Sequence, residues 1–128
     1  MLATASVDRS VRAHDLRLAQ GEAAPSSAGR NATTARMLGH EYAVRRVSWS
    51  PHARDMLATA SYDMTARIWG VSSSAAGPAP HAAMGQGAQL LRIHDAHTEF
   101  VVGLDWSLFE QGAIATGAWD QQVHFWRA

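Results

Sequence analysis

Leu57-Ala-Thr-Ala-Ser-Tyr-Asp63 is the segment that decides the fold, because two other segments of the chain repeat it: Leu2-Ala-Thr-Ala-Ser-Val-Asp8 and Ile114-Ala-Thr-Gly-Ala-Trp-Asp120. The aspartates that end these segments, Asp8, Asp63 and Asp120, are separated by two nearly equal intervals. Such self-similarity indicates a repeat architecture, in which each copy folds into the same small unit and packs on its neighbour.

A second set of residues keeps the same register. The interval from His40 to Asp63 is identical to the interval from His97 to Asp120. An aromatic side chain follows each of the three aspartates at one fixed distance along the chain: His14, Trp69 and Trp126. The repeat therefore extends well beyond the short segment that first reveals it.

Three further motifs resemble those of WD-repeat β-propellers: Leu38-Gly-His40, Val47-Ser-Trp-Ser-Pro51 and Arg67-Ile-Trp69. The repeats are longer than the roughly 40–45 residues usual for this family, so each repeat is expected to carry an insertion. The resemblance implies an all-β fold, a partial propeller of about two and a half blades, each a four-stranded antiparallel sheet.

Apolar runs and alternations, rich in β-branched and aromatic side chains, predict about ten strands. They are expected near residues 1–6, 10–16, 33–38, 44–49, 56–61, 64–69, 89–94, 101–106, 113–118 and 121–127. In this assignment the first blade lacks its innermost strand and the last blade its outermost strand.

The whole chain, 1–128, is expected to be the C-terminal part of one propeller, with blades at 1–38, 39–95 and 96–128. Low-complexity insertions rich in Ala, Gly, Ser and Pro occupy 18–32 and 71–89, and are interpreted as tolerated loops or partner-docking loops. With open sheet edges at both ends, the isolated chain is expected to aggregate and not to bind ligand alone.

Composition narrows the function classes. Lys plus Arg and Asp plus Glu are both 11, so no net field attracts nucleic acid or an anionic membrane. The chain has no cysteine, which excludes disulfides and thiolate sites and fits a reducing compartment. It contains no apolar run of about 20 residues and no signal-peptide pattern, so a cytosolic protein without membrane insertion is expected.

His40, Asp63 and either Ser61 or Thr59 contain the groups of a hydrolase triad. The WD-repeat resemblance implies a different role, a buried hydrogen-bond network that fixes each blade, because unpaired buried polar groups are costly. We favour the network and expect no catalytic residue. Its expected members are His40, Thr59, Ser61, Asp63, Trp69, His97, Thr116, Asp120 and Trp126.

No cofactor or metal site is expected from the sequence. His94, Asp95 and His97 are ligand types for Zn²⁺, but they lack a further ligand nearby, and His97 already belongs to the expected network. No Gly-rich phosphate-binding loop follows a predicted strand and opens a helix, which argues against a nucleotide site.

Residues beside the network positions are expected on the disc face where propellers commonly hold ligands. They are Tyr42, Tyr62, Glu99, Phe100 and Trp119. Aromatic side chains in such turns are typical interface anchors, although packing between blades explains them equally well. Glu99 adds an anionic group for a basic residue of a partner.

Three segments resemble the C-terminal blades of the peroxisomal receptors for type-2 targeting signals, the peroxin-seven family: Leu38-Gly-His-Glu-Tyr-Ala-Val-Arg-Arg-Val47, Ser61-Tyr-Asp-Met-Thr-Ala-Arg67 and His97-Thr-Glu-Phe-Val-Val-Gly-Leu-Asp-Trp-Ser107. The resemblance implies a receptor that binds the N-terminal signal helix of cargo proteins. With a co-receptor peroxin it would deliver them for matrix import, and so occupy the cytoplasm and the peroxisomal matrix. The alternative is an unrelated WD-repeat scaffold.

Overall fold

The computed structural model describes residues 1–19, 33–71 and 87–128, which form ten strands and one short helix. The first strands are β1 (Leu2–Ala5), β2 (Val11–His14) and β3 (Thr33–Met37), with α1 (Leu16–Ala19) between the last two. Next come β4 (Val44–Trp49), β5 (Met56–Ser61), β6 (Ala66–Val71) and β7 (Ala88–His94). The chain continues with β8 (Val101–Trp106), β9 (Ala113–Ala118) and β10 (Val123–Arg127).

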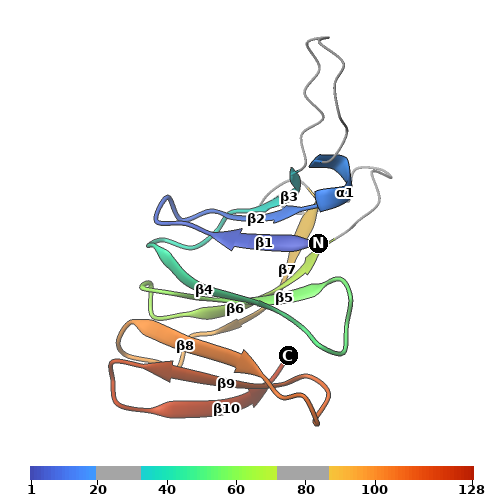
Figure 1. The fold of residues 1–128 in the computed structure, drawn as a ribbon. Coiled ribbons are helices and arrows are strands. Elements are labelled where there is room, and N and C mark those ends of the chain that lie inside the picture. Colours follow the sequence, from blue (N-terminus) through green and yellow to red (C-terminus); the bar gives the residue numbers. More distant parts are fainter. Residues whose placement is uncertain (20–32, 72–86) are drawn as a thin grey trace.

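The strands form three antiparallel sheets that stack as layers (Figure 1). The middle sheet has the order β4-β5-β6-β7, and it lies between the sheet β1-β2-β3 and the sheet β8-β9-β10. Within each sheet, strands that follow one another in the chain pair, as in a propeller blade. The all-β, partial-propeller fold class predicted from the sequence is confirmed.

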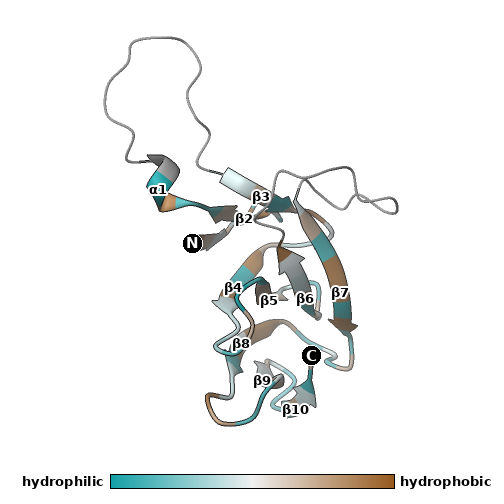
Figure 2. Cartoon of the chain, turned by 90° about the vertical axis from the view of Figure 1, so that its right-hand side faces the viewer, coloured by the Kyte–Doolittle hydropathy of each residue, from teal (hydrophilic) through white to brown (hydrophobic). Residues whose placement is uncertain are grey.

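The core lies in the two gaps between the sheets. On β5, Leu57 packs toward the first sheet with Val11 and Met37, whereas Ala58 and Ala60 pack toward the last sheet. Successive strand residues point to opposite faces, so one strand supplies both gaps. This is why β5 and β6 are buried along almost their whole length, while β10 alternates between exposed and half-buried residues. Figure 2 shows the strands of the middle sheet, β4 to β7, between the strands of the first sheet and those of the last sheet.

Tryptophans end the first strands of the middle and last sheets, β4 and β8, and one of them links these two strands. The indole N–H of Trp106 on β8 donates to the backbone carbonyl of Ser48 on β4, at 3.1 Å. Trp49 occupies the same place at the end of β4, and its Nε1 is the one buried side-chain nitrogen or oxygen of the described residues without a hydrogen-bond partner. By analogy with Trp106, the indole N–H of Trp49 is placed to donate a hydrogen bond to a backbone carbonyl of an adjacent strand.

The largest departure from the predicted strands follows β2, which ends at His14 rather than at residue 16. The carboxylate of Asp15 accepts the backbone N–H of Arg17 at 3.0 Å and so caps the one-turn helix α1. The predicted insertions at 18–32 and 71–89 lie mostly outside the described residues, although β6 extends to Val71 and β7 begins at Ala88. In the described ranges no helix is long and apolar enough to cross a membrane.

The turns between β1 and β2, between β5 and β6, and between β9 and β10 share one geometry. In each, the residue after the aspartate has a left-handed backbone: Arg9 (φ 71°), Met64 (φ 66°) and Gln121 (φ 65°). The aspartate Oδ1 accepts the backbone N–H two residues further on, at 2.9 to 3.0 Å in all three turns. These turns take up the first residues that the sequence assigned to 64–69 and 121–127, so β6 begins at Ala66 and β10 at Val123.

Substitutions at Met64 test this turn geometry. A left-handed backbone costs an ordinary residue about 1–2 kcal/mol, costs glycine almost nothing, and is worst for a β-branched side chain. We expect Met64→Gly to leave the urea midpoint unchanged or raised. Met64→Val should lower the free energy of unfolding below that of wild type, and by at least about 1–2 kcal/mol relative to Met64→Gly, in the full-length protein. Equal midpoints for the two variants would contradict the assigned turn.

Candidate functional site

A closed hydrogen-bond network lies at one end of the middle sheet. His40 Nδ1–H donates to Asp63 Oδ2 at 2.7 Å, and the hydroxyl of Thr59 donates to His40 Nε2 at 2.7 Å. The indole N–H of Trp69 completes the chain by donating to Thr59 Oγ1 at 2.9 Å. The side chains of His40 and Asp63 are only 1% and 4% exposed, so each polar atom depends on its protein partner.

The last sheet repeats this network with the residues that the sequence placed in register. His97 Nδ1–H donates to Asp120 Oδ2 at 2.8 Å, and His97 Nε2 lies 3.0 Å from Thr116 Oγ1. Trp126 Nε1–H donates to the same hydroxyl oxygen at 3.2 Å. Two of the three sheets therefore hold an equivalent, fully connected set of four side chains.

In the first sheet the network is altered, because His14 takes the place of the tryptophan. His14 Nε2 lies 3.1 Å from Thr4 Oγ1 on the neighbouring strand. The carboxylate of Asp8, half exposed, accepts from the hydroxyl of Ser10 within its own turn and lies 3.6 Å from the Arg12 guanidinium. This sheet thus contains the turn without the buried histidine and aspartate.

Ser61 takes a place beside the network rather than inside it. Its hydroxyl lies 3.1 Å from the Tyr42 carbonyl and 2.9 Å from the Ala43 carbonyl, to either of which it donates. It also accepts the backbone N–H of Asp63 at 3.2 Å. No contact between Ser61 and His40 is among the hydrogen bonds of the described residues. Ser61 therefore joins the segment before β4 to the turn after β5.

The surroundings of Asp63 shift its proton affinity in opposing directions. Burial alone raises the pKa of Asp63, but the hydrogen bonds from His40 and Thr65 outweigh burial and hold the pKa well below its ordinary value. In the last sheet the pKa of Asp120 is lowered in the same way, because His97 and backbone N–H groups outweigh burial. Both carboxylates are ionised near neutral pH.

Three of the five residues expected on the ligand-binding face form one group, which we call the aromatic face: Tyr62, Phe100 and Trp119. The rings of Tyr62 and Phe100 stack with centroids 4.7 Å apart, and the Phe100 and Trp119 centroids are 5.2 Å apart. The backbone N–H of Trp119 donates to the Phe100 carbonyl at 3.1 Å. Residues from the middle and last sheets therefore meet at the same end of the stack.

The remaining two residues, Tyr42 and Glu99, are exposed and occupy equivalent positions two residues after His40 and His97. Tyr42 is 59% exposed, and Trp119 of the aromatic face is 61% exposed. Glu99 directly precedes Phe100, and it makes no ion pair within the described part of the chain. The structure thus leaves aromatic surface, and the carboxylate of Glu99 beside it, open to solvent.

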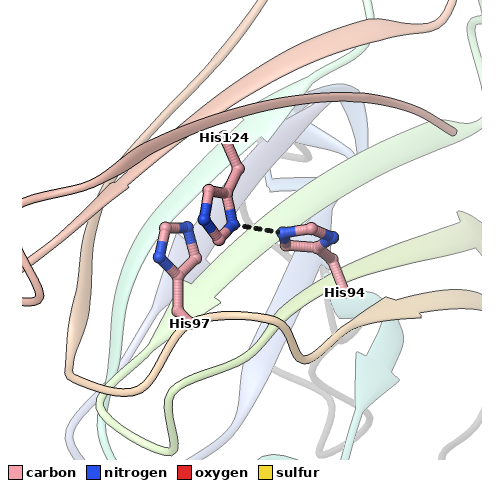
Figure 3. Close-up of side chains that lie close together, drawn as sticks. All are labelled: His94, His97 and His124. Carbon is pink, nitrogen blue, oxygen red and sulfur yellow. Dashed lines mark hydrogen bonds between the residues drawn. The ribbon is translucent and has the colours of Figure 1, made fainter.

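A third group was not anticipated from the sequence. His124 of β10 lies beside His94 and His97, and one ring nitrogen of each of the three histidines lies within 4.8 Å of the other two (Figure 3). Burial, followed by the nearby His124 and His97, lowers the pKa of His94. The sequence does not group His124 with His97, because the two residues are far apart in the chain and His124 lies on a separate strand.

Comparison with known proteins agrees with the repeat pattern. Residues 32–70 and 88–127 match the family described as WD domain, G-beta repeat. Over 95 residues the chain is 43% identical to the peroxisomal targeting signal 2 receptor of Komagataella phaffii, covering 71% of this chain and 25% of that protein. The receptor of the same name from Saccharomyces cerevisiae is 40% identical over 90 residues, covering 68% of this chain and 24% of that protein.

A plant protein gives a similar result. Peroxisome biogenesis protein 7 of Arabidopsis thaliana is 35% identical over 89 residues, which are 70% of this chain and 24% of that protein. The chain therefore spans about a quarter of the length of the curated relatives it matches.

Removing the central carboxylate tests the network. Asp63→Ala leaves the His40 N–H and the Thr65 hydroxyl without their acceptor, and should cost at least about 2 kcal/mol in thermal or urea unfolding of the full-length protein. Asp55→Ala is the matched control, because Asp55 is exposed and makes its contact to Val71 through its backbone carbonyl. Equal stability of the two variants would contradict the network.

Acidification tests the same carboxylate. The pKa of Asp63 is lowered in the folded protein, so the unfolded chain takes up the proton first as pH falls. The contribution of Asp63 to the free energy of unfolding is complete above the ordinary aspartate pKa of about 3.9 and is lost progressively below it. The difference in urea midpoint between wild type and Asp63→Asn should be constant from pH 7 to pH 5 and shrink by pH 3. A difference that grows on acidification would contradict this.

Proposed function

This chain belongs to the WD domain, G-beta repeat family, and we propose that it forms part of a receptor for type-2 peroxisomal targeting signals. One observation carries the proposal: the chain is similar, over more than two thirds of its length, to yeast proteins of that name. A stack of WD-repeat sheets occurs in many unrelated binding proteins, so the fold does not identify the ligand. The similarity to these receptors supports a type-2 targeting signal as that ligand.

The aromatic face, with Tyr42 and Glu99 beside it, is the surface we propose for the signal helix. An amphipathic helix binds by laying its apolar stripe against hydrophobic side chains at the ends of several structural elements. Tyr62, Phe100 and Trp119 come from two sheets and already pack on one another, so little side-chain entropy is lost when a helix covers them. Such preformed aromatic groups are typical of binding hot spots.

Glu99 gives this surface its charge preference. It is exposed and adjacent to Phe100, where it can meet a basic side chain that flanks the apolar stripe of a helix. An exposed ion pair of this kind contributes about 1 kcal/mol or less, and mainly guides orientation and association rate. We therefore assign the affinity to the aromatic residues and the orientation to Glu99.

We also propose that the triad-like residues have no catalytic role. Ser61 and Thr59 are both 0% exposed, and their hydroxyls are engaged by backbone carbonyls and by His40 respectively. A nucleophile must approach the reacting carbon of its substrate, which needs access from solvent. These hydroxyls support a structural role.

As a receptor of this kind, the protein would act with a co-receptor peroxin and would occupy both the cytoplasm and the peroxisomal matrix. Its partners would be cargo proteins with a type-2 signal. We propose neither nucleic acid nor direct membrane insertion among its interactions, since Lys plus Arg and Asp plus Glu balance at 11 each.

Fluorescence polarisation with a labelled type-2 signal peptide tests the proposal on the full-length protein. Trp119→Ala and Tyr62→Ala should each weaken binding at least about tenfold, the loss expected when a hot-spot aromatic residue is truncated. Glu99→Lys should weaken binding less and make it less sensitive to salt. All three substitutions lie outside the four-residue networks, and thermal melts of Trp119→Ala and Glu99→Lys should change little because both side chains are exposed. Tyr62→Ala also removes the stack on Phe100, so its melt should fall modestly while the protein stays folded at the assay temperature.

Phe109→Ala is the control for nonspecific apolar contact. Phe109 is 94% exposed and lies in the loop between β8 and β9, whereas Trp119 lies in the turn between β9 and β10, at the other end of the strands (Figure 1). Its removal should leave the affinity unchanged. A wild-type protein that does not bind the peptide would overturn the receptor proposal, whereas tight binding by all variants would overturn only the proposed face.

A further inference from the structure

The histidine cluster His94, His97 and His124 lies where the outer strand of the middle sheet leads into the last sheet (Figure 3). His94 ends β7, His97 follows in the link to β8, and His124 comes from β10. His94 Nε2 and His124 Nδ1 are 3.0 Å apart, and the rings of His97 and His124 stack with centroids 3.9 Å apart. Two imidazoles, from the end of β7 and from the link to β8, thus meet a third from β10.

The fold itself does not require two of these histidines. The position of His124 is filled by Arg67 in the middle sheet and by Arg12 in the first, and each arginine lies 3.6 Å from the aspartate of its own turn. The position of His94 is filled by Met37, which is buried in the core beside the middle sheet. The middle sheet therefore builds the same network without these two imidazoles, so the network does not require the cluster, which lies where the middle and last sheets meet.

Neighbouring groups set which ring nitrogens carry lone pairs. Asp120 accepts from His97 Nδ1–H, so the lone pair of His97 is on Nε2. Gln122 Oε1 lies 3.0 Å from His124 Nε2 and accepts its proton, so the lone pair of His124 is on Nδ1, the atom that faces His94. A carboxylate or amide behind each imidazole is the usual support for histidine metal ligands.

We propose that His94, His97 and His124 bind a divalent cation that prefers imidazole nitrogen, such as Zn²⁺. Zn–N bonds of about 2.0–2.1 Å in a tetrahedral site place two ligand nitrogens about 3.3 Å apart, close to the 3.0 Å between His94 and His124. The ion takes the place of the proton shared by these two nitrogens, and that proton leaves to solvent. His97 supplies the third ligand through Nε2, which gives up its contact with the Thr116 hydroxyl. Because an imidazole lone pair lies in the ring plane, the rings of His97 and His124 also turn out of their parallel stack when the ion binds.

The ring of His94 is held by a neighbouring side chain. His94 stacks on the indole of Trp126 with centroids 4.7 Å apart and planes within 6°, which restricts rotation of its ring. His97 is buried, whereas His94 and His124 are half-buried, so solvent reaches part of the cluster. Three nitrogen ligands with one open position form a recognised zinc arrangement, and imidazole ligands suit Zn²⁺ better than Mg²⁺ or Ca²⁺.

Zinc titration of the full-length protein by calorimetry tests the site. Wild type should bind one Zn²⁺ that His124→Arg and His94→Met bind at least about tenfold more weakly. Both substitutions introduce the residue that another sheet of the stack carries at the equivalent position, so the variants are expected to fold, and thermal melts without metal check this. Zinc should raise the melting temperature of wild type more than that of either variant.

His52→Gln controls for adventitious binding, because His52 is exposed and lies outside the cluster. This variant should keep the wild-type affinity and stoichiometry. Equal zinc binding by wild type, His124→Arg and His94→Met would overturn the proposal, and so would a loss in His52→Gln as large as theirs. A Co²⁺ titration of wild type alone gives a second readout, in which absence of visible ligand-field absorption would also overturn it. Neither result bears on the receptor proposal.

Discussion

The hydrogen bond between a buried histidine and a buried aspartate is the interaction on which the rest of the structure depends. In the middle sheet it joins His40, which precedes the innermost strand, to Asp63 in the turn between the second and third strands. A contact between residues distant in sequence thus closes the sheet at one end. Because both groups are buried, any other arrangement of the turn would leave an ionised carboxylate unpaired, which is strongly unfavourable.

This closed end also positions the aromatic face. Tyr62 directly precedes Asp63, Trp119 directly precedes Asp120, and both turns continue into a residue with left-handed backbone. Their ring positions therefore follow from the carboxylate hydrogen bonds beneath them. A rigid turn that presents an exposed ring is an efficient way to hold a binding surface, since the scaffold rather than the ligand orders the side chain.

Most of the fold could be predicted from the sequence, because its determinants are local and periodic. Apolar runs or alternations predicted the strands, and two equal spacings marked the histidine and aspartate pairs that the structure brings together. Helix α1 could not be predicted, since its one turn depends on a single capping contact from Asp15. The meeting of His124 with His94 also escaped prediction, because it depends on how two sheets stack rather than on any spacing within one strand.

Differences between the repeats are therefore more informative about function than their similarities. Positions shared by the middle and last sheets, such as Thr59 and Thr116, build the same buried network and explain only the fold. Where the repeats differ, the substitution needs another reason. His124 gives up the arginine–aspartate contact made by Arg67 and gains two histidine neighbours instead. A structural role alone would be served by retaining arginine, so the exchange favours a site whose chemistry requires imidazole.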